Sequence, residues 1–380
     1  MKKALLYIAY TIAYGFWWAM SLLPLWLLYC FSDLLYLLMA YVARYRHAVI
    51  WSNLTSSFPE KTEAELHEIE HKFYHWFCDY LVETMKLMTI SKQQIMKRMT
   101  FTGMETFNQI LSERQSIGVY LGHIGNWEWI TSMPYWAPNS LCCQLYHPLE
   151  NEYFDRLFKF VRERQGAYCI PMQESLRKII QFTHEGKPLV VGYISDQVPL
   201  WWNIHHWVDF LHHDTPVLTG AERIVKHTGQ AFFYGHVTRV KRGHYNCEMR
   251  LISRNTKEMA DFQITDLYYK ELEKSKKFGI SISDSYNYYD TRTNFYQDID
   301  EKRNAKTENE KSKPMPVVRE YIMSNSKFNF DITLDIDLLE KSKLEIKNID
   351  NLISSLENSV TYLINVLEDK LNIFMEILNI

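Results

Sequence analysis

The N-terminal segment of the chain is almost entirely apolar. Between Ala4 and Val42 the only charged side chain is Asp33, and Tyr and Trp are frequent. A bilayer crossing needs about 20 apolar residues, so the segment is long enough for one tilted span with an interfacial helix, or for a helical hairpin. Pro24 divides it near the middle, and basic residues flank both ends. We therefore predict a membrane anchor over residues 1–43, with a buried core helix as the alternative.

Beyond this segment, the spacing of apolar residues alternates between helical and strand-like periods. A long helix is predicted to begin at Thr62 or Glu63 and to end near Met88. The strand candidates that follow are 116–122, 140–146, 188–194, 231–237 and 245–252. The helix candidates are 126–133, 150–165, 173–184, 217–228 and 262–276. This alternation predicts an α/β domain over residues 44–276, with a central mixed sheet flanked by helices.

The pattern changes after about Lys277. Residues 277–335 are mostly polar, which predicts a linker. Residues 336–380 regain apolar positions every three or four residues, which predicts an amphipathic helical extension. This helix would either fold back on the main domain or pair in a coiled coil.

The overall composition limits the chemistry that we expect. The six cysteines show no Cys-x-x-Cys pair and no spacing of a disulfide framework, which is typical of a reduced compartment. Adjacent Cys142 and Cys143 lie in an apolar run and are expected to pack as small hydrophobic side chains. The formal net charge is only −3, and we expect no nucleic-acid partner.

Candidate catalytic residues lie at the end of the predicted strand 116–122 and directly after it, in the sequence Gly-His-Ile-Gly-Asn-Trp-Glu at 122–128. On one continuous helix, side chains five positions apart would point about 140° away from each other. A turn at Gly125 and a helix capped by Asn126 would instead bring His123 and Glu128 together. Glu128 would then orient one ring nitrogen of His123 and leave the other as a general base. The alternative is structural: His123 would only form hydrogen bonds within the turn, and Glu128 would only be an acidic residue in the first turn of the helix.

Two other clusters of polar residues could indicate a different function. His67 and His71 match the pattern His-Glu-x-x-His on the long helix, the spacing of a zinc metallopeptidase. The surrounding helix surface is highly charged and no third-ligand motif follows, so we expect no metal site and no cofactor. The basic residues Arg239, Lys241 and Arg242 lie between two predicted strands, where we expect a solvated hairpin end, with a phosphate site as the alternative.

Several ordered blocks of residues, together with the His-x4-Glu motif, resemble one protein family. The blocks are 45–47, 53–54, 57–59, 145–151, 162–166, 195–199 and 210–224. Over about residues 1–276 the chain resembles the bacterial late acyltransferases of lipid A biosynthesis, within the lysophospholipid acyltransferase superfamily. His123 and Glu128 stand at the positions of that family's motif, whereas the tail does not match.

The resemblance implies a membrane-bound O-acyltransferase. It implies that a fatty acyl chain moves from acyl carrier protein or acyl-CoA to a hydroxyl of a lipid A precursor, on the cytoplasmic side of a bacterial inner membrane. His123 would be the general base and Glu128 its orienting acid. Arg164, Asp196 and Asn126 would be substrate-binding residues, although a structural hydrogen-bonding role for Asp196 is equally compatible. Another glycolipid or aminolipid acceptor, and an inactive membrane scaffold with a partner-binding C-terminal helix, are the alternatives.

Overall fold

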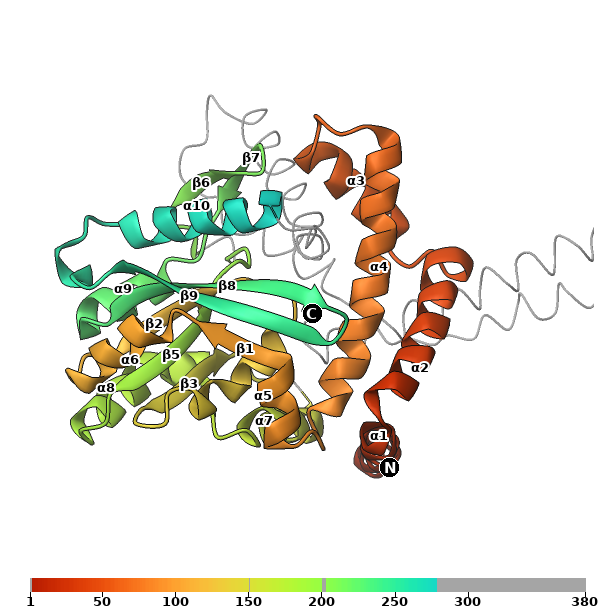
Figure 1. The fold of residues 1–380 in the computed structure, drawn as a ribbon, viewed down its shortest axis with the longest axis horizontal. Helices are drawn as coiled ribbons and strands as arrows, with labels where there is room; N and C mark the ends of the chain where they lie inside the picture. Colours follow the sequence, from red (N-terminus) through yellow and green to blue (C-terminus); the bar gives the residue numbers. More distant parts are fainter. Residues whose placement is uncertain (1, 150, 200–202, 279–380) are drawn as a thin grey trace, which may run out of the picture. The chain divides into compact units, whose positions relative to one another are not determined.

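A seven-stranded sheet forms the centre of the fold (Figure 1). The computed structural model describes residues 2–149, 151–199 and 203–278. The strand order is β1-β9-β8-β2-β5-β3-β4. The strands are β1 (Met99–Thr102), β2 (Ile117–Leu121), β3 (Leu141–Tyr146), β4 (Tyr168–Pro171), β5 (Leu189–Ile194), β8 (Ala231–Lys241) and β9 (His244–Ser253). A separate two-stranded sheet pairs β6 (Trp207–Phe210) with β7 (His213–Pro216).

The mixed character predicted for the central sheet is confirmed. Neighbouring strands run parallel except at the β8–β9 hairpin, which is antiparallel. All five predicted strands are present, and each end lies within four residues of its expected position. The four strands that were not predicted, β1, β4, β6 and β7, have only four residues each, which is too short for a periodic signal.

Helices surround this sheet. They are α3 (His47–Ser57), α4 (Glu63–Lys86), α5 (Lys92–Arg98), α6 (Met104–Ser112), α7 (Glu152–Glu163), α8 (Ser175–His184), α9 (Gly220–Thr228) and α10 (Gln263–Phe278). Short 3-10 helices are η2 (Trp127–Tyr135), η3 (Met172–Glu174) and η5 (Thr256–Glu258). The predicted start of the long helix is confirmed, because Thr62 caps α4 through a reciprocal hydrogen-bonded box with Glu65. The helices α3, α5 and α6 were not predicted.

The two faces of the sheet are covered by different elements (Figure 1). On one face, Tyr120 of β2 packs against Tyr268 of α10, with ring centroids 5.4 Å apart. On the other face, Phe107 of α6 packs edge-on against Phe233 of β8 at 5.0 Å. Tyr268 also donates a hydrogen bond to the carbonyl of Leu121 at 2.7 Å. The last residue of β2 is therefore fixed by α10 immediately before the predicted catalytic turn begins.

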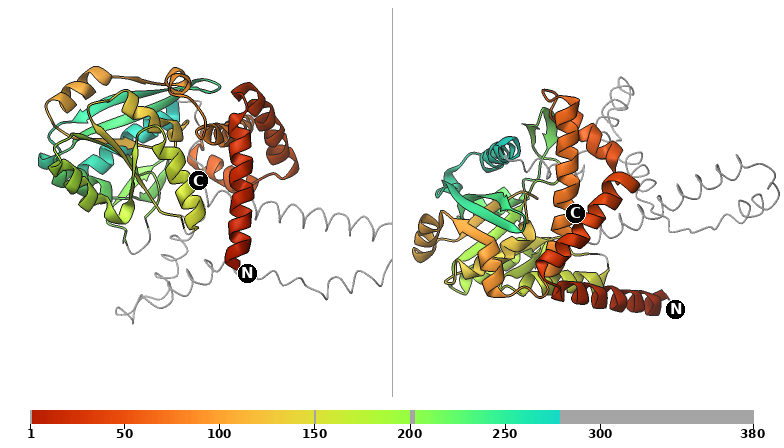
Figure 2. Two further views of the ribbon diagram at one scale, coloured as in Figure 1. Left: turned by 90° about the horizontal axis from the view of Figure 1, so that it is seen from below. Right: turned by 45° about the vertical axis from the view of Figure 1, so that its right-hand side comes forward.

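The apolar N-terminal segment forms two helices, as the position of Pro24 predicted. Helix α1 (Lys2–Leu22) ends before this proline, and α2 (Leu25–Leu37) begins after it and continues into the π-helix η1 (Leu38–Val42). Helix α2 packs against α4, and α1 packs against α4 and α7 (Figure 2). Within the described residues, one helical stretch, Leu25–Val42, is long and apolar enough to cross a membrane by length and composition, and 22% of it is buried.

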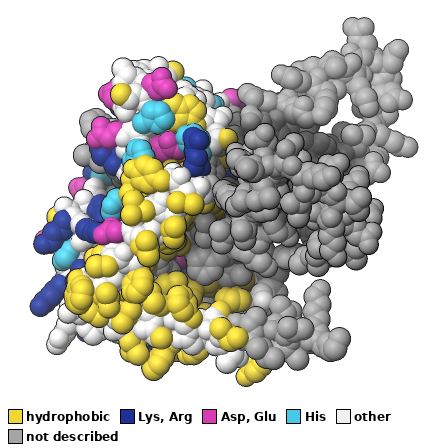
Figure 3. Space-filling model, turned by 90° about the vertical axis from the view of Figure 1, so that its right-hand side faces the viewer, with side chains coloured by type: hydrophobic (Ala, Val, Ile, Leu, Met, Phe, Trp, Pro, Cys, Tyr) yellow, Lys and Arg dark blue, Asp and Glu magenta, His cyan; other side chains and the backbone are white. Residues whose placement is uncertain are grey.

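The outward faces of these two helices are apolar. Figure 3 shows this side of the molecule, where hydrophobic side chains cover much of the described surface. Among the exposed side chains are Ile12, Phe16, Trp18, Trp26, Leu34, Leu37 and Val42. The predicted linker and amphipathic helix of residues 277–380 lie outside the described residues, apart from the last two residues of α10.

Candidate active site

Strand register brings His123 and Asp196 to the same edge of the sheet. Strands β2 and β5 are parallel neighbours, and Leu121 pairs with Ile194. His123 and Asp196 each stand two residues beyond these paired positions. Ligands of open α/β sheets bind at the carboxyl ends of the strands, which is where both side chains lie.

His123 and Asp196 form a doubly hydrogen-bonded pair. Nδ1 of the histidine lies 2.7 Å from Oδ1 of the aspartate, and the backbone N–H of His123 donates to Oδ2 at 2.8 Å. Because a carboxylate only accepts, the ring proton belongs on Nδ1 and leaves a lone pair on Nε2. No hydrogen bond among the described residues uses Nε2. The imidazole is 23% exposed and the carboxylate 6%, so the histidine ring is accessible while its partner is shielded.

Glu128 is engaged by a different residue. Its two carboxylate oxygens accept hydrogen bonds from Nε and Nη2 of Arg162, at 2.9 and 2.5 Å. Burial opposes the charge of Arg162, but the facing carboxylate outweighs it and raises the pKa of the guanidinium. Thus the hydrogen bond expected between His123 and Glu128 is replaced by two separate pairs, His123–Asp196 and Glu128–Arg162. Asp196 takes the place at Nδ1 that the spacing suggested for Glu128.

The turn between these residues is formed as its sequence predicted. Gly125 has a φ of +62°, a conformation that favours glycine, and Asn126 caps η2 by accepting from the backbone N–H of Trp129 at 3.1 Å. A Cβ atom at Gly122 would lie 2.5 Å from Leu272 of α10. The absence of a side chain there lets α10 close over the turn.

The remaining predicted residues make structural contacts. Asn126 is fully buried and donates to Glu83 at 2.7 Å. Arg164 stands at the end of α7 and donates to the backbone carbonyls of Leu87 and Ile90. Neither residue lines the cavity described below, so their predicted role in substrate binding stays a prediction.

An open cavity of about 130 Å³ lies beside the two pairs. His123, Glu128 and Arg162 contribute to its wall together with Trp127, whose ring meets the imidazole edge-on at 5.0 Å. Apolar parts of the wall come from Val119, Leu121, Ile130, Met133, Leu145, Ala167, Val190 and Ile194. The cavity thus joins a polar site to an apolar recess, which suits a ligand with a reactive end and a hydrocarbon part.

The cysteines beside the cavity do not supply a nucleophile. Burial raises the pKa of Cys142 to about 11 and that of Cys143 to about 12, so both thiols are protonated near neutral pH. Their predicted packing as small hydrophobic side chains is confirmed by their burial.

The His-Glu-x-x-His residues do not form a metal centre within the described part of the chain, where no group of three or more His, Cys, Asp or Glu side chains could hold an ion. Instead, His67 stacks on Trp51 with ring centroids 4.3 Å apart. His71 stacks on Tyr41 at 5.5 Å.

Arg162 is the site residue that sequence reasoning missed. It lies in the block 162–166, where Arg164 was preferred on the basis of the family resemblance. Helical spacing does not separate the two, because Arg162 lies four positions from buried Phe158 and Arg164 three positions from buried Val161. Nothing local in the sequence indicates that Glu128 faces this position.

The fold and site define an α/β protein with a histidine–aspartate pair at the carboxyl edge of a sheet and an apolar recess beside it. Comparison with protein families identifies the group to which it belongs. The model of the bacterial lipid A biosynthesis acyltransferase family matches residues 1–275, so the chain is a member of that family. The resemblance inferred from the sequence is thereby confirmed, and membership supports acyltransferase activity. No curated protein matches the chain.

Proposed function

We propose that this protein transfers a fatty acyl chain from an acyl thioester to a hydroxyl of a lipid A precursor at a membrane surface. The observation that carries the proposal is the His123–Asp196 pair, whose imidazole lies on the wall of a cavity with an apolar recess. Membership of the lipid A biosynthesis acyltransferase family supports the same reaction. The donor, acyl carrier protein or acyl-CoA, would present its thioester at the mouth of the cavity.

In this proposal His123 acts as the general base. Nε2 takes the proton of the acceptor hydroxyl as its oxygen attacks the thioester carbonyl carbon. The tetrahedral intermediate then expels the thiolate, and the new ester bond replaces the carbon–sulfur bond. The proton on Nε2 passes to the departing sulfur, which restores the base. Asp196 holds the ring orientation and stabilises the imidazolium that forms between these steps.

We propose that Glu128 and Arg162 provide the charge that the same site offers to the substrate. Buried arginine is well suited to bind a phosphate or to stabilise a developing oxyanion. Glu128 would keep the guanidinium oriented rather than contact His123. This assignment differs from the pairing that the motif spacing suggested. Arg164 would support the segment after α4, through the carbonyls of Leu87 and Ile90.

The position of Gly192 predicts an effect on acyl chain length. Gly192 of β5 lines the cavity, and a Cβ atom there would meet only the backbone oxygen of Cys143, at 3.7 Å. Valine at this position should therefore fold normally and fill the recess. We expect Gly192→Val to lower kcat/KM for the longest accepted donor, by about fourfold for each methylene displaced, and to spare shorter donors. A series of acyl donors of increasing length measures this.

Gly220→Val is the matched control for that series. Gly220 lies at the start of α9, outside the cavity wall, and a Cβ atom there has no neighbour within 4 Å. This variant should keep the wild-type chain-length profile. If Gly192→Val shows the same profile as the wild type, the acyl chain does not occupy this recess.

Attachment to a membrane is part of the proposal. The outward faces of α1 and α2 expose apolar side chains, whereas the inward face of α2 is tied to the folded domain through Tyr29, Ser32 and Asp33. We propose that the outward faces contact lipid while α2 stays on the domain. Arg44 is exposed at the end of this segment, where it could meet phosphates of the acceptor or of the membrane.

Lipid analysis tests the proposed function directly. Lipid A from bacteria lacking related acyltransferases should gain one acyl chain, as a single mass increment, when this protein is expressed. The His123→Ala protein, present at an equal level in the membrane, should give none. Unchanged lipid A with abundant wild-type protein would contradict the proposed acceptor, and a mass increment on another glycolipid would identify the alternative acceptor.

A further inference from the structure

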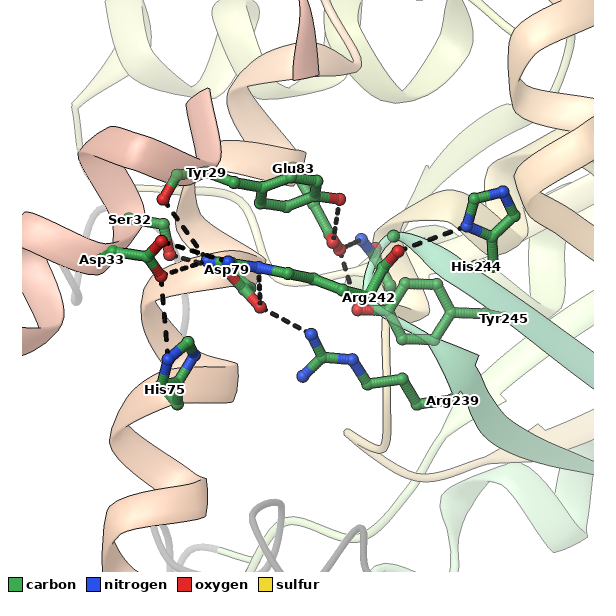
Figure 4. Close-up of polar contacts among 12 residues, drawn as sticks. Tyr29, Ser32, Asp33, His75, Asp79, Glu83, Arg239, Arg242, His244 and Tyr245 are labelled. Atoms are coloured by element: carbon green, nitrogen blue, oxygen red, sulfur yellow. Dashed lines mark hydrogen bonds and ion pairs between the residues drawn. The ribbon is translucent and has the colours of Figure 1, made fainter. Parts of the chain in front are cut away.

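A buried carboxylate on α4 connects three parts of the fold. Glu83 is fully buried, and its carboxylate accepts hydrogen bonds from three side chains (Figure 4). Tyr29 of α2 donates at 2.9 Å, Tyr245 of β9 donates at 2.9 Å, and the amide of Asn126 donates at 2.7 Å. No ion pair among the described residues includes Glu83. Its burial is therefore offset by these hydrogen bonds and not by a cation.

Glu83 holds the start of η2 at two points. Asn126, bound to the carboxylate, caps the helix through Trp129 N–H. The indole N–H of Trp129 donates to the backbone carbonyl of Glu83 at 3.1 Å. Trp127 and Glu128, which both line the cavity, lie between these two attachments.

The surroundings of these contacts leave little space for movement. A Cβ atom at Gly125 would lie 2.8 Å from Val237, and one at Gly243 would lie 2.0 Å from the hydroxyl of Tyr29. Asn126 is fully buried. Burial, together with nearby Asp79, raises the pKa of Glu83 to about 7, and the three donors act in the opposite direction. An acid kept in such a place has a cost that a hydrophobic residue would avoid.

We infer that Glu83 is a positioning residue, which holds the turn of His123 and Glu128 in place and connects it to the seat of α2 on α4. The inference rests on the proposed function for its effect on catalysis. It acts through Asn126 and Trp129, because Glu83 itself does not line the cavity. The seating of the apolar helix α2 thereby contributes to the geometry of the base.

A second network of hydrogen bonds and ion pairs surrounds Asp79, and it connects other parts of the fold than the Glu83 network does. The Asp79 carboxylate accepts hydrogen bonds from Ser32, Arg239 and Arg242, and Arg242 also pairs with Asp33 (Figure 4). These contacts fasten α2 to α4 and to the β8–β9 hairpin without reaching Asn126. They show that α2 can be held on the domain by groups other than Glu83. The hairpin end predicted for this cluster is confirmed and Lys241 is exposed, whereas the two arginines are paired with Asp79 and not solvated.

Three substitutions test the inference in the full-length protein in detergent. Glu83→Ala removes all three contacts, and Glu83→Gln retains them, because the amide oxygen can accept from Asn126 and Tyr245 while its NH2 group donates to the Tyr29 hydroxyl. Tyr29→Phe removes only the link to α2. Tyr74→Phe is the matched control, since it removes the hydrogen bond that a buried tyrosine of α4, the helix of Glu83, donates to the carbonyl of Tyr45 at 2.7 Å.

Kinetics and hydrogen exchange provide two readouts. We expect Glu83→Ala to lower kcat by roughly 10- to 100-fold with little change in KM, because the base is misplaced rather than the substrate lost. Glu83→Gln should restore most of this loss, and Tyr29→Phe should lower kcat more than Tyr74→Phe does. Deuterium uptake over residues 122–130 should rise in Glu83→Ala and Tyr29→Phe, and it should stay at the wild-type level in Tyr74→Phe.

Several results would overturn the inference. Wild-type kcat and wild-type exchange in Glu83→Ala would show that the carboxylate positions nothing. Equal effects of Tyr29→Phe and Tyr74→Phe would show general loosening of α4. Should Glu83→Ala not fold, Glu83→Gln and Tyr29→Phe carry the same comparison. If the wild type transfers no acyl chain, the proposed function fails, and the exchange data still decide whether Glu83 orders the turn.

Discussion

Replacing His123 with alanine should lower kcat for acyl transfer by roughly 10²- to 10⁴-fold, the range that a positioned general base contributes. The reason is that other titratable groups on the described part of the cavity wall are engaged or protonated. Glu128 is bound by Arg162, Nδ1 of His147 faces the carbonyl of Pro148, and burial raises the pKa of the cysteine thiols. KM should change little, since the imidazole is small and the acyl recess is intact. Steady-state transfer with a radiolabelled donor measures both constants.

Asp196→Asn tests whether the aspartate fixes the tautomer of His123. The side chain keeps its shape, but an amide can donate toward Nδ1, which favours the proton on Nε2 and removes the base. We expect kcat to fall nearly as far as in His123→Ala. The double variant should be no worse than either single change, because the two residues act as a unit.

His184→Ala is the control for this pair of substitutions. His184 is exposed at the end of α8, away from the cavity, so transfer should match that of the wild type. If His123→Ala keeps more than about a tenth of wild-type kcat, general-base catalysis by this histidine is contradicted. If Asp196→Asn is fully active while His123→Ala is inactive, the pairing does not fix the tautomer.

The sequence was sufficient to predict the scaffold but not the pairing on it. Strand β2 and the turn at Gly125 could be predicted because each depends on residues that are adjacent in the sequence. The partner of His123 lies 73 positions away, and only the parallel register of β2 with β5 brings it near. Local spacing offered Glu128 as a nearby carboxylate, yet the direction of η2 turns that side chain toward α7. A prediction of which strands are neighbours would have been needed to choose Asp196.

The apolar N-terminus illustrates the same limit. Its composition predicted a membrane anchor, and Asp33 stood out as a lone charge within it. In the folded protein this carboxylate pairs with Arg242, from a hairpin more than 200 positions later in the chain. The charge is therefore part of the seat of α2 on the domain. Hydropathy predicts the outward face of such a helix correctly. It does not reveal that a polar residue on the inward face has a partner on a strand far away in the sequence.

The Glu128–Arg162 pair should have the largest effect on stability of any contact at the site. The carboxylate is 3% exposed and the guanidinium 14%, so removing either partner leaves a nearly buried charge. We expect Glu128→Gln and Arg162→Met each to lower the free energy of unfolding by about 3–5 kcal/mol. Denaturant unfolding of the protein in detergent measures the change, and activity is measured in parallel on the folded fraction.

The exposed pair Arg177–Glu174 is the matched control for stability. Arg177 lies on α8 and Glu174 at the end of η3; their side chains are 3.0 Å apart, with exposures of 76% and 41%. Arg177→Met should change stability by less than about 1 kcal/mol, because exposed ion pairs contribute little. A similar loss in Arg177→Met and Arg162→Met would mean that burial does not set the cost.

The double variant Glu128→Leu, Arg162→Met separates stability from chemistry. Both charges are gone and apolar side chains fill the space, so most of the stability lost in the single variants should return. Acyl transfer should stay low if the Arg162 cation stabilises the oxyanion or binds phosphate. Recovery of both stability and kcat would show that the pair only maintains the fold, and that the polar end of the cavity depends on His123 and Asp196 alone.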